Sequence, residues 1–494
     1  MLGPVLYFRG LVGERCRLAA IIIIPVGEVP PPLKIADGQA VRAVRLASRR
    51  SRALWCYTFT LAAATDGEGI DYAIGERAWR VFPPPASGHL RIAFTACNGQ
   101  ERDLPGDARP GRNAHWCHLA NEHARHPFQL LLQGGDQVYA DGVWDVVPEL
   151  ARWITDGRPL DRTLSTTALS AVHDFYFDLY CWVWGQRDLV PLLASIPSLM
   201  MWDDHDIFDG WGSHGSTLQA CPVFQAVWSA AREHFALFQL GACPAARPEE
   251  LGDTRATHFG WSFAVGNTGV IAPDLRSERT QRRVMGEAGW NWFVQALAEL
   301  GHCRHVLLIS SVPLVNFDLS PLERLLALLP ADWLMQDDLR DQWRSYVHRE
   351  EWRRLVRHLL DFSEQTRTRV TVLSGEIHLG ALGKVYRDET ECLQLIASGI
   401  VHPPPPRRYA RLLDLLSRGS SKVTPDVRLA MLPLPNLNIR YLAARNWLSL
   451  DCRPDGAIAA QWHGEGIDAE VRLAIPSPNA LHGESTKNAF DQMS

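Results

Sequence analysis

The chain has 494 residues, of which 46% are hydrophobic and 21% are charged, and this is the composition of a globular protein with room for two or three domains. The formal net charge of −5 offers no basic field for DNA or RNA, so a nucleic-acid-binding protein is not expected. Ten cysteines are spread singly along the chain without a CxxC pair, which argues against a zinc ribbon or a dense disulfide framework and favours a reducing compartment.

The first 85 residues are rich in β-forming runs. Apolar runs at 19–26 and 54–62 are separated by turns with proline and glycine, and the segment ends at the prolines of 83–85. This pattern predicts a small N-terminal β-sandwich domain over 1–85. The apolar run at 18–26 is too short to span a bilayer and no twin-arginine leader precedes it, so we predict no membrane span and expect a cytoplasmic location.

From about residue 90, apolar strands alternate with stretches that carry apolar residues at helical spacing. Such alternation is typical of an α/β fold. The predicted strands are 90–96, 128–133, 198–202, 269–273, 305–310, 369–374 and 393–398. The predicted helices are roughly 112–125, 169–186, 222–238, 286–300 and 349–362.

Two long insertions, 142–196 and 207–265, follow two of these strands, and they are candidates for a helical lid over a substrate. Their tryptophans either pack between helices or stack on a base or sugar. These tryptophans are Trp144, Trp153, Trp182, Trp184 and Trp211. After the prolines of 403–406 we predict a helical segment, a β-rich C-terminal extension at 426–476 and a disordered polar tail at 477–494.

Four of the predicted strands end in polar clusters. The clusters are TACNG at 95–99, GGDQVYAD at 134–141, WDDHDIFDG at 202–210 and SGEIHLG at 374–380. Ligands of open α/β sheets bind at the carboxyl ends of the strands, so the clusters are expected to converge on one crevice. One acid after a strand is commonly a helix cap or a turn former, but four clusters together are hard to explain structurally.

The residue types in these clusters match metal binding. Asp, Asn, His, Cys and Tyr are all metal ligands, and two neighbouring cations need a shared carboxylate, for which Asp136 and Asp204 are the candidates. His205 stands between three acids, which alternatively form a solvated acidic face. Met201 and Trp202 directly upstream favour burial, and a buried acidic cluster needs a metal or protonation to neutralise it.

The motifs GDQVYAD, WDDHDIFDG, SGEIHLG and the single-cysteine TACNG closely resemble those of the PhoD-like alkaline phosphatases, a branch of the calcineurin-like metallophosphoesterase superfamily. The resemblance runs in the same order from about 90 to 405. It implies a four-layer αββα sandwich with a dinuclear metal centre, within a metallophosphatase domain at 90–425.

The resemblance also implies roles for individual residues. Asp136 would bridge the two metals, and Cys97 and Tyr139 would bind a ferric ion. A phenol has a pKa of about 10, so binding as phenolate near neutral pH requires a strong Lewis acid such as Fe³⁺. Apart from the motif, each of these two side chains is typical of a protein core. His378 would bind the second metal, which is calcium in the best-known secreted members of the family.

The resemblance also bears on three residues of the clusters WDDHDIFDG and SGEIHLG. Asp204 takes the place of an asparagine ligand in the superfamily, and His205 takes that of the histidine that contacts the phosphate or protonates the leaving oxygen. Glu376 stands where the family usually has aspartate. It is expected to bind metal after a local adjustment or to change the preferred cation.

Further side chains are candidates for positions around the metals or the substrate. They are Asn98, Asp203, Asp206, Arg276 and His402. One of Asp203, Asp206 and Asp141 is expected to orient His205. Arg276 or Arg279 contacts phosphate or forms a surface ion pair, and His402 lines the pocket or caps its own loop.

These features predict metal-dependent hydrolysis of a small-molecule phosphoester by a hydroxide that bridges two cations, Fe³⁺ with Ca²⁺ or another divalent ion. The alternative is a non-catalytic scaffold that keeps the fold with an impaired metal site, for which Glu376 is the only support. A serine hydrolase, a P-loop protein and a zincin are disfavoured because GxSxG, GxxxxGK[ST] and HExxH are absent. Monoesters, diesters, nucleotides and lipid headgroups stay open as substrates, as does the oligomeric state.

Overall fold

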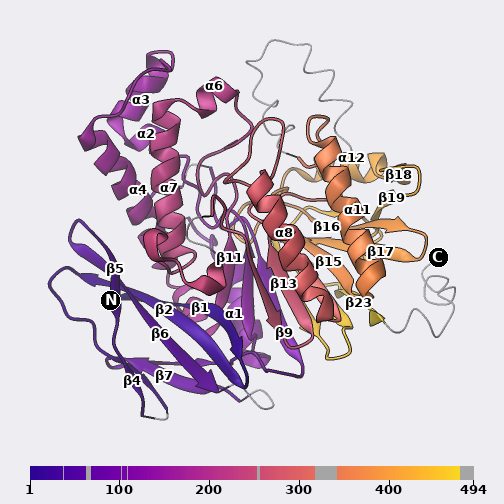
Figure 1. Cartoon of the computed structure of the whole chain (residues 1–494), viewed down its shortest axis with the longest axis horizontal. Coiled ribbons are helices and arrows are strands. Elements are labelled where there is room, and N and C mark those ends of the chain that lie inside the picture. The colour runs from indigo at the N-terminus through magenta and orange to yellow at the C-terminus, as the bar shows by residue number, and fades with distance from the viewer. Residues whose placement is uncertain are drawn as a thin grey trace.

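The computed structural model of the chain describes residues 1–36, 38–62, 68–101, 103–107, 109–252, 256–316 and 342–478. Two large sheets form its centre (Figure 1). The ten-stranded sheet has the order β23-β22-β21-β9-β10-β11-β1-β2-β6-β5. Its strands are β1 (Leu2–Val12), β2 (Arg15–Pro25), β5 (Val44–Arg49), β6 (Arg52–Ala62), β9 (Leu90–Thr95), β10 (Leu130–Gly134), β11 (Ser198–Met201), β21 (Asn446–Cys452), β22 (Ile458–Gly464) and β23 (Val471–Ile475).

The second large sheet has nine strands, in the order β12-β13-β14-β15-β17-β16-β19-β18, with β20 paired to β16. Its strands are β12 (Trp261–Val265), β13 (Thr268–Ala272), β14 (His305–Ser310), β15 (Arg369–Ser374), β16 (Gly380–Arg387), β17 (Thr390–Ile396), β18 (Ser420–Lys422), β19 (Arg428–Leu432) and β20 (Tyr441–Leu442). Strands β10, β14 and β15 are buried at every position, as strands covered on both faces must be, and this explains their nearly continuous apolar sequence.

The two sheets pack face to face around one continuous hydrophobic core. Tryptophans bridge them: Trp462 on β22 donates to the carbonyl of Ile396 on β17 at 2.8 Å, and Trp261 on β12 donates to the carbonyl of Met200 on β11 at 2.8 Å. Figure 1 shows α8 (Glu287–Glu299) and α11 (Arg349–Thr366) in front of the nine-stranded sheet. With helices on the outside of both sheets, the molecule is the predicted four-layer αββα sandwich.

Helix α11 illustrates why these layers form. Its buried positions Trp352, Leu355, Val356 and Leu359 recur at spacings of three and four, so one stripe of the helix faces the sheet. On the other side of the molecule, α5 (Val190–Ser195) packs on β1, and α1 (Ala114–Arg125) contacts β21 through a hydrogen bond at 3.3 Å from Trp447 to His118.

The β-rich segment before residue 85 is continuous with the ten-stranded sheet. Strand β1 pairs in parallel with β11, and β2, β6 and β5 follow in order beyond it. A separate four-stranded sheet lies beside them, made of β4 (Ala40–Val41), β3 (Leu33–Ile35), β7 (Ile70–Ile74) and β8 (Arg77–Val81). The strands predicted here are therefore present, while the domain limits at 85, 90 and 425 stay predictions.

The insertions are helical, as predicted. They contain α2 (Val143–Val146), α3 (Pro148–Thr155), α4 (Thr166–Trp184), α5, α6 (Ser216–Gln219), α7 (Pro222–Phe238) and the short 3₁₀ turns Pro244–Ala246 and Glu249–Leu251. Their tryptophans pack between helices: Trp144 and Trp153 stack at 5.9 Å, and both lie against Phe224 of α7. The tryptophans were predicted either to pack between helices or to stack on a base or sugar, and in the structure they pack between helices.

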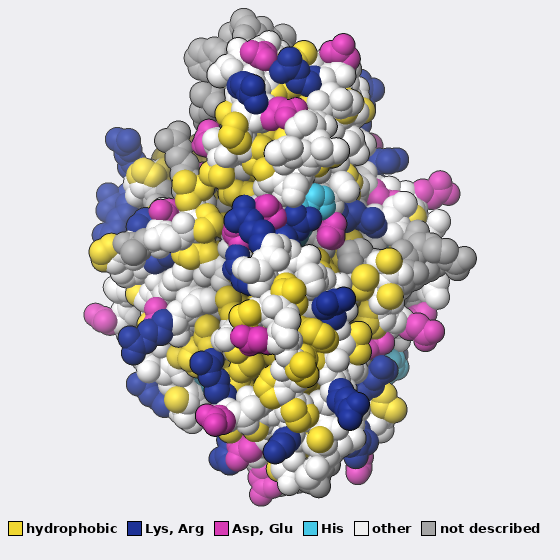
Figure 2. Space-filling view, turned by 90° about the vertical axis from the view of Figure 1, so that its left-hand side faces the viewer, with side chains coloured by type: hydrophobic (Ala, Val, Ile, Leu, Met, Phe, Trp, Pro, Cys, Tyr) yellow, Lys and Arg dark blue, Asp and Glu magenta, His cyan; other side chains and the backbone are white. Residues whose placement is uncertain are grey.

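The C-terminal part begins with α12 (Arg407–Leu416) and continues with strands that extend both large sheets. Of the tail predicted at 477–494, residues 479–494 lie outside the described residues. No helix in the described ranges is long and apolar enough to cross a membrane. The face drawn in Figure 2 mixes acidic, basic and apolar side chains, without one large patch of a single sign among its described residues.

Candidate metal centre

The carboxyl ends of the parallel strands meet at one edge of the sandwich. In the first sheet β9, β10 and β11 are parallel, and in the second β13, β14, β15 and β17 are parallel. All four predicted polar clusters follow strands of these two sets. The predicted convergence at one crevice is therefore the arrangement in the structure.

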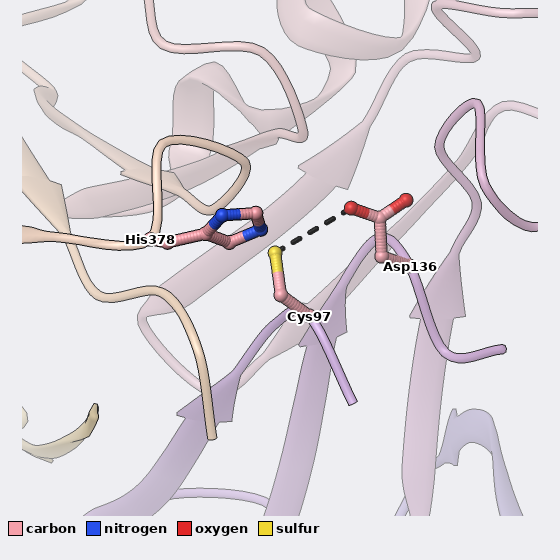
Figure 3. Close-up of side chains that lie close together, drawn as sticks. All are labelled: Cys97, Asp136 and His378. Carbon is pink, nitrogen blue, oxygen red and sulfur yellow. Dashed lines mark hydrogen bonds between the residues drawn. The ribbon is translucent and has the colours of Figure 1, made fainter. Parts of the chain in front are cut away.

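Cys97, Asp136 and His378 form the centre of this edge (Figure 3). Cys97 follows β9, Asp136 follows β10, and His378 comes from the loop after β15, so both sheets contribute. One donor atom of each lies within 4.8 Å of the others, and the Cys97 thiol donates to Asp136 Oδ2 at 3.5 Å. Sulfur, oxygen and nitrogen donors thus lie together, and such a mixed donor set suits a borderline cation.

The backbone at this edge is left-handed at four candidate ligands. The φ angles are 56° at Cys97, 55° at Asp136, 63° at Glu376 and 54° at His378. Non-glycine residues rarely adopt this conformation, and it concentrates at functional sites where the surrounding structure enforces it. Here, hydrogen bonds beyond the strand ends hold the backbone in this conformation. The Cys97 amide donates to the Gly135 carbonyl at 3.1 Å, and the Asn98 amide donates to the Asp136 carbonyl at 2.8 Å.

Asp136 belongs to two groups of donor atoms. The second group consists of Asp136, Asp203 and Asp204, again with one donor atom of each within 4.8 Å of the others. Asp136 Oδ1 is buried and accepts no hydrogen bond from any described residue. Burial and the neighbouring Asp203 carboxylate raise the pKa of Asp136 well above its usual range. A cation would satisfy this oxygen and neutralise the charge, so the donor set fits a bound metal.

Arg276 lies at the same edge, after β13, and is completely buried. Its Nε donates to Asp203 and its Nη2 donates to Asp204 Oδ1 at 3.3 Å. The expected surface ion pair is therefore a buried one, and no contact to substrate is needed to explain this arginine. Ser311, which follows β14, also donates to Asp203 at 2.7 Å. Arg279 is buried as well.

Tyr139 packs beside Cys97 and reaches the histidine of the group. Its hydroxyl lies 3.2 Å from His378 Nε2. Burial, together with the Cys97 sulfur, raises the pKa of the Tyr139 phenol well above its usual range. Burial and Asp136 likewise raise the pKa of the Cys97 thiol. Both groups are therefore neutral in the metal-free protein, and only a strong cation would make them anionic.

His205 is oriented by Asp141. Its Nδ1 lies 2.8 Å from Asp141 Oδ2, and its ring stacks on Tyr139 with centroids 4.3 Å apart. Burial acts to lower its pKa, but the carboxylates of Asp141 and Asp204 outweigh it, so the pKa of His205 is raised well above its usual range. Of the three acids predicted for the orienting position, Asp141 occupies it. A donor atom of His205 also lies within 4.8 Å of Asp204 and Asp209.

Asp206 has a different use. Its carboxylate accepts hydrogen bonds from the amides of Asp136, Val138 and Asp203 at 2.9–3.0 Å and from Gln239 at 2.7 Å. It therefore ties the loop after β10 to the loop after β11. Asn98 is also buried and accepts from the Trp116 indole at 2.8 Å, which fixes the turn after Cys97.

His402 lies next to the centre. Its ring stacks on His378 with centroids 3.4 Å apart, and its Nε2 lies 2.8 Å from Glu101 Oε1. The hydrogen bond from His402 lowers the pKa of Glu101 to about 2. His402 also faces Tyr139, with centroids 5.7 Å apart, so it lines the site rather than only capping its loop.

Glu376 is the predicted ligand that stands apart. Its Oε1 accepts a hydrogen bond from Gln342 at 2.8 Å, and it belongs to none of the donor groups found among the described residues. The backbone of Glu376 nevertheless lies close to the centre, since it forms a hydrogen bond with the Cys97 sulfur.

Two residues of the site were not predicted from the sequence. Ser398, just after β17, donates to Cys97 Sγ at 3.1 Å and accepts from the His378 amide at 3.1 Å. Glu101 partners His402. Ser398 could have been predicted as a polar residue that directly follows a strand. Glu101 lies in an irregular segment, where no sequence pattern indicates its role.

Comparison with known proteins identifies the family of the chain. The family model of PhoD related phosphatase matches residues 96–332 and 331–420. The uncharacterized protein YGR266W of Saccharomyces cerevisiae is 24% identical over 452 residues, covering 73% of this chain and 64% of that protein, so the chain spans less than two thirds of this relative's length.

Two solved structures share the fold. The structure of PhoD has a TM-score of 0.57 at 12% identity and covers 96% of this chain and 89% of its own. The purple acid phosphatase PPD1 from yellow lupin (Lupinus luteus) seeds has a TM-score of 0.53 at 10% identity. The match covers 96% of this chain and 73% of the lupin chain. The chain has a metallophosphoesterase fold and belongs to the family of PhoD-related phosphatases.

Proposed function

We propose that this chain hydrolyses small-molecule phosphoesters with two metal ions held between the ends of β9, β10, β11 and β15. The observation that carries the proposal is Asp136. It is buried, has a left-handed backbone, and is the one residue common to the Cys97–Asp136–His378 and Asp136–Asp203–Asp204 groups of the described chain. A carboxylate shared between two donor groups is what a pair of neighbouring cations requires.

The proposed ligands divide between two ions. Cys97, Tyr139 and Asp136 would hold a ferric ion, because a buried thiol and a buried phenol need a strong Lewis acid to lose their protons. Asp136 and Asp204 would hold a divalent ion such as calcium, joined by His378 and, after a rotation away from Gln342, by Glu376. In the structure His378 shares a donor group with Cys97 and Asp136, and Asp136 is the carboxylate that would contact both ions.

When bound, the two cations would supply Lewis acidity that lowers the pKa of water and neutralises charge on the phosphoryl oxygens. The side chains around them have separate tasks. Asp141 holds Nδ1 of His205, which leaves Nε2 to give a proton to the departing oxygen. Arg276 fixes Asp203 and Asp204 in place, so the acidic loop keeps one geometry.

The test is hydrolysis of p-nitrophenyl phosphate and bis(p-nitrophenyl) phosphate by the purified chain, before and after chelation and again after metal is returned. We expect turnover that chelation abolishes and metal restores. The Asp136→Asn variant should stay inactive under all conditions, whereas Asp161→Asn, which changes an exposed aspartate outside the centre, should behave like the parent.

A folded chain that binds no metal and hydrolyses neither ester would contradict the proposal and favour the scaffold. Glu376 is the observation behind that alternative, since its carboxylate is turned toward Gln342. A Glu376→Asp variant tests whether this side chain is the cause. If the variant binds metal and hydrolyses the esters while the parent does not, the defect lies in Glu376 alone. A small-molecule substrate and a cytoplasmic location stay predictions.

A further inference from the structure

Helix α12 presents apolar side chains to solvent. Tyr409 is 42% exposed, Leu412 52%, Leu415 58% and Leu416 50%. Spacings of three and four place them along one side of the helix, next to Ala410 and Leu413, which are its buried residues. Single exposed leucines need no explanation, but four large apolar side chains on ten residues form a contiguous surface, which we call the α12 face.

Contacts with other described residues hold the inner side of α12 in place. Asp414 accepts from the Arg440 amide at 2.8 Å and lies 3.6 Å from its guanidinium. Directly after the helix, the Ser417 hydroxyl lies 3.2 Å from that of Tyr441 on β20. Figure 1 shows α12 in the upper right of the view, close to β18 and β19.

Basic side chains border the α12 face. Four exposed arginines belong to the helix or the residues next to it, namely Arg407, Arg408, Arg411 and Arg418. Asp414 is the only acid of the helix, and it is engaged by Arg440 and by Arg418 at 3.5 Å. An exposed apolar stripe with flanking arginines is the pattern of a helix that lies in a lipid–water interface, where arginines reach the headgroups while leucines enter the acyl boundary.

We propose that the α12 face docks this protein on an anionic lipid surface. A second copy of the chain fits less well, because two α12 faces in contact would bring eight arginines together. An acidic protein partner would need a groove, whereas leucines that project from a convex helix match a planar, deformable surface. Helix α12 begins five residues after His402, so docking would hold one rim of the candidate metal centre near the membrane.

This docking does not depend on hydrolysis, so it is tested without substrate. The full chain is mixed with vesicles of phosphatidylcholine alone or with 30% phosphatidylserine, and the bound fraction is measured by co-sedimentation. We expect binding to the anionic vesicles that is at least about tenfold stronger than to the neutral ones and that weakens at high salt.

Two triple variants and their matched controls sharpen the test. The apolar variant is Leu412→Ser, Leu415→Ser, Leu416→Ser, and its control is Val12→Ser, Val29→Ser, Val44→Ser, at three exposed aliphatic positions elsewhere. The charge variant is Arg407→Gln, Arg408→Gln, Arg411→Gln, and its control is Arg42→Gln, Arg158→Gln, Arg282→Gln. Each variant should reduce vesicle affinity at least about tenfold, and each control should leave it within about twofold.

All chains should keep the parent's circular dichroism and melting temperature, because the changed positions are exposed. The proposal is overturned if the parent does not sediment with anionic vesicles, or if both variants bind as the parent does. It is also overturned if analytical ultracentrifugation shows that the parent is a dimer and the apolar variant a monomer. The α12 face would then be the interface between two copies of the chain.

Discussion

Two groups of histidines lie at different places in this molecule, and their surroundings differ in kind. At the candidate metal centre, the rings of His378 and His402 stack 3.4 Å apart. Between α1 and the ten-stranded sheet, His118 lies 5.4 Å from His463, whose ring in turn stacks on Trp447 at 4.0 Å. Ring stacking alone therefore does not distinguish a reactive site from a packed one.

The difference lies in the partners. In the second group His118 accepts from the Trp447 indole, and His463 lies 2.9 Å from the Ser449 hydroxyl. Burial, aided for His463 by its histidine neighbour, lowers the pKa of His115 to about 4 and of His463 to about 3. At the metal centre, by contrast, the histidines meet carboxylates, a thiol and a phenol, and the backbone is left-handed at Cys97, Asp136 and His378. A group of histidines indicates chemistry only where anionic ligands and enforced backbone accompany it.

The largest expected effect separates the two groups by activity. Asp136→Asn should lower turnover at least about a thousandfold, because the carboxylate shared by both donor groups is lost. His463→Gln, in the second group, should leave turnover within about twofold. Phosphoester hydrolysis with matched protein concentrations checks both, and melting curves show that each variant is folded. Equal losses in the two variants would erase the distinction between the groups.

A second prediction concerns proton donation. His205→Gln should lower kcat by about 10²–10⁴ while the metal content stays that of the parent, because the proposed role of His205 is to protonate the leaving oxygen. The loss should be smaller for p-nitrophenyl phosphate, whose leaving group needs little protonation, than for an alkyl phosphate. Metal loss in this variant would instead identify His205 as a ligand.

A third prediction concerns Asp141. Asp141→Asn should lower kcat about 10–100-fold, the usual cost of removing the group that orients a functional histidine. The Asp141 carboxylate helps to raise the pKa of His205, and under the proposed function the protonated ring is the active form. Removing it should therefore move the alkaline limb of the pH–rate profile to lower pH. An unshifted limb with lower kcat would indicate a merely structural aspartate.

The smallest effect concerns stability. His115 and His463 have folded pKa values below the unfolded value of about 6.5, so the unfolded chain binds more protons between about pH 6.5 and 4. The free energy of unfolding should fall as pH falls through this window, by up to about 1.4 kcal/mol per pH unit for each histidine. Urea unfolding at pH 7 and 5 checks this, and His463→Gln should flatten the dependence. A steeper dependence in the variant would contradict it.

The convergence of the site could be predicted from the sequence because each cluster directly follows an apolar strand. Predicted strands such as 305–310 and 369–374 coincide with β14 and β15, and helix 222–238 coincides with α7. Asp136, Cys97 and His378 come together because parallel strands place their carboxyl ends at one edge.

Other features depend on contacts distant in sequence and could not be predicted. The pairing of β1 with β11 joins Tyr7 to Ser198, and no local pattern indicates it. Burial of Arg276 beside Asp203 depends on the meeting of two sheets. The left-handed backbone at Cys97 has no sequence signal, since that residue is not a glycine.

The proposed function requires that Asp136 and its neighbours hold two metal ions. Elemental analysis of the purified and reconstituted chain, alongside Asp136→Asn, measures how many are bound. We predict about two metal ions per parent chain, one of them iron with a phenolate absorption band, and at most about one in the variant. Equal metal content in the two proteins, or no metal in a folded and reconstituted parent chain, would contradict the account.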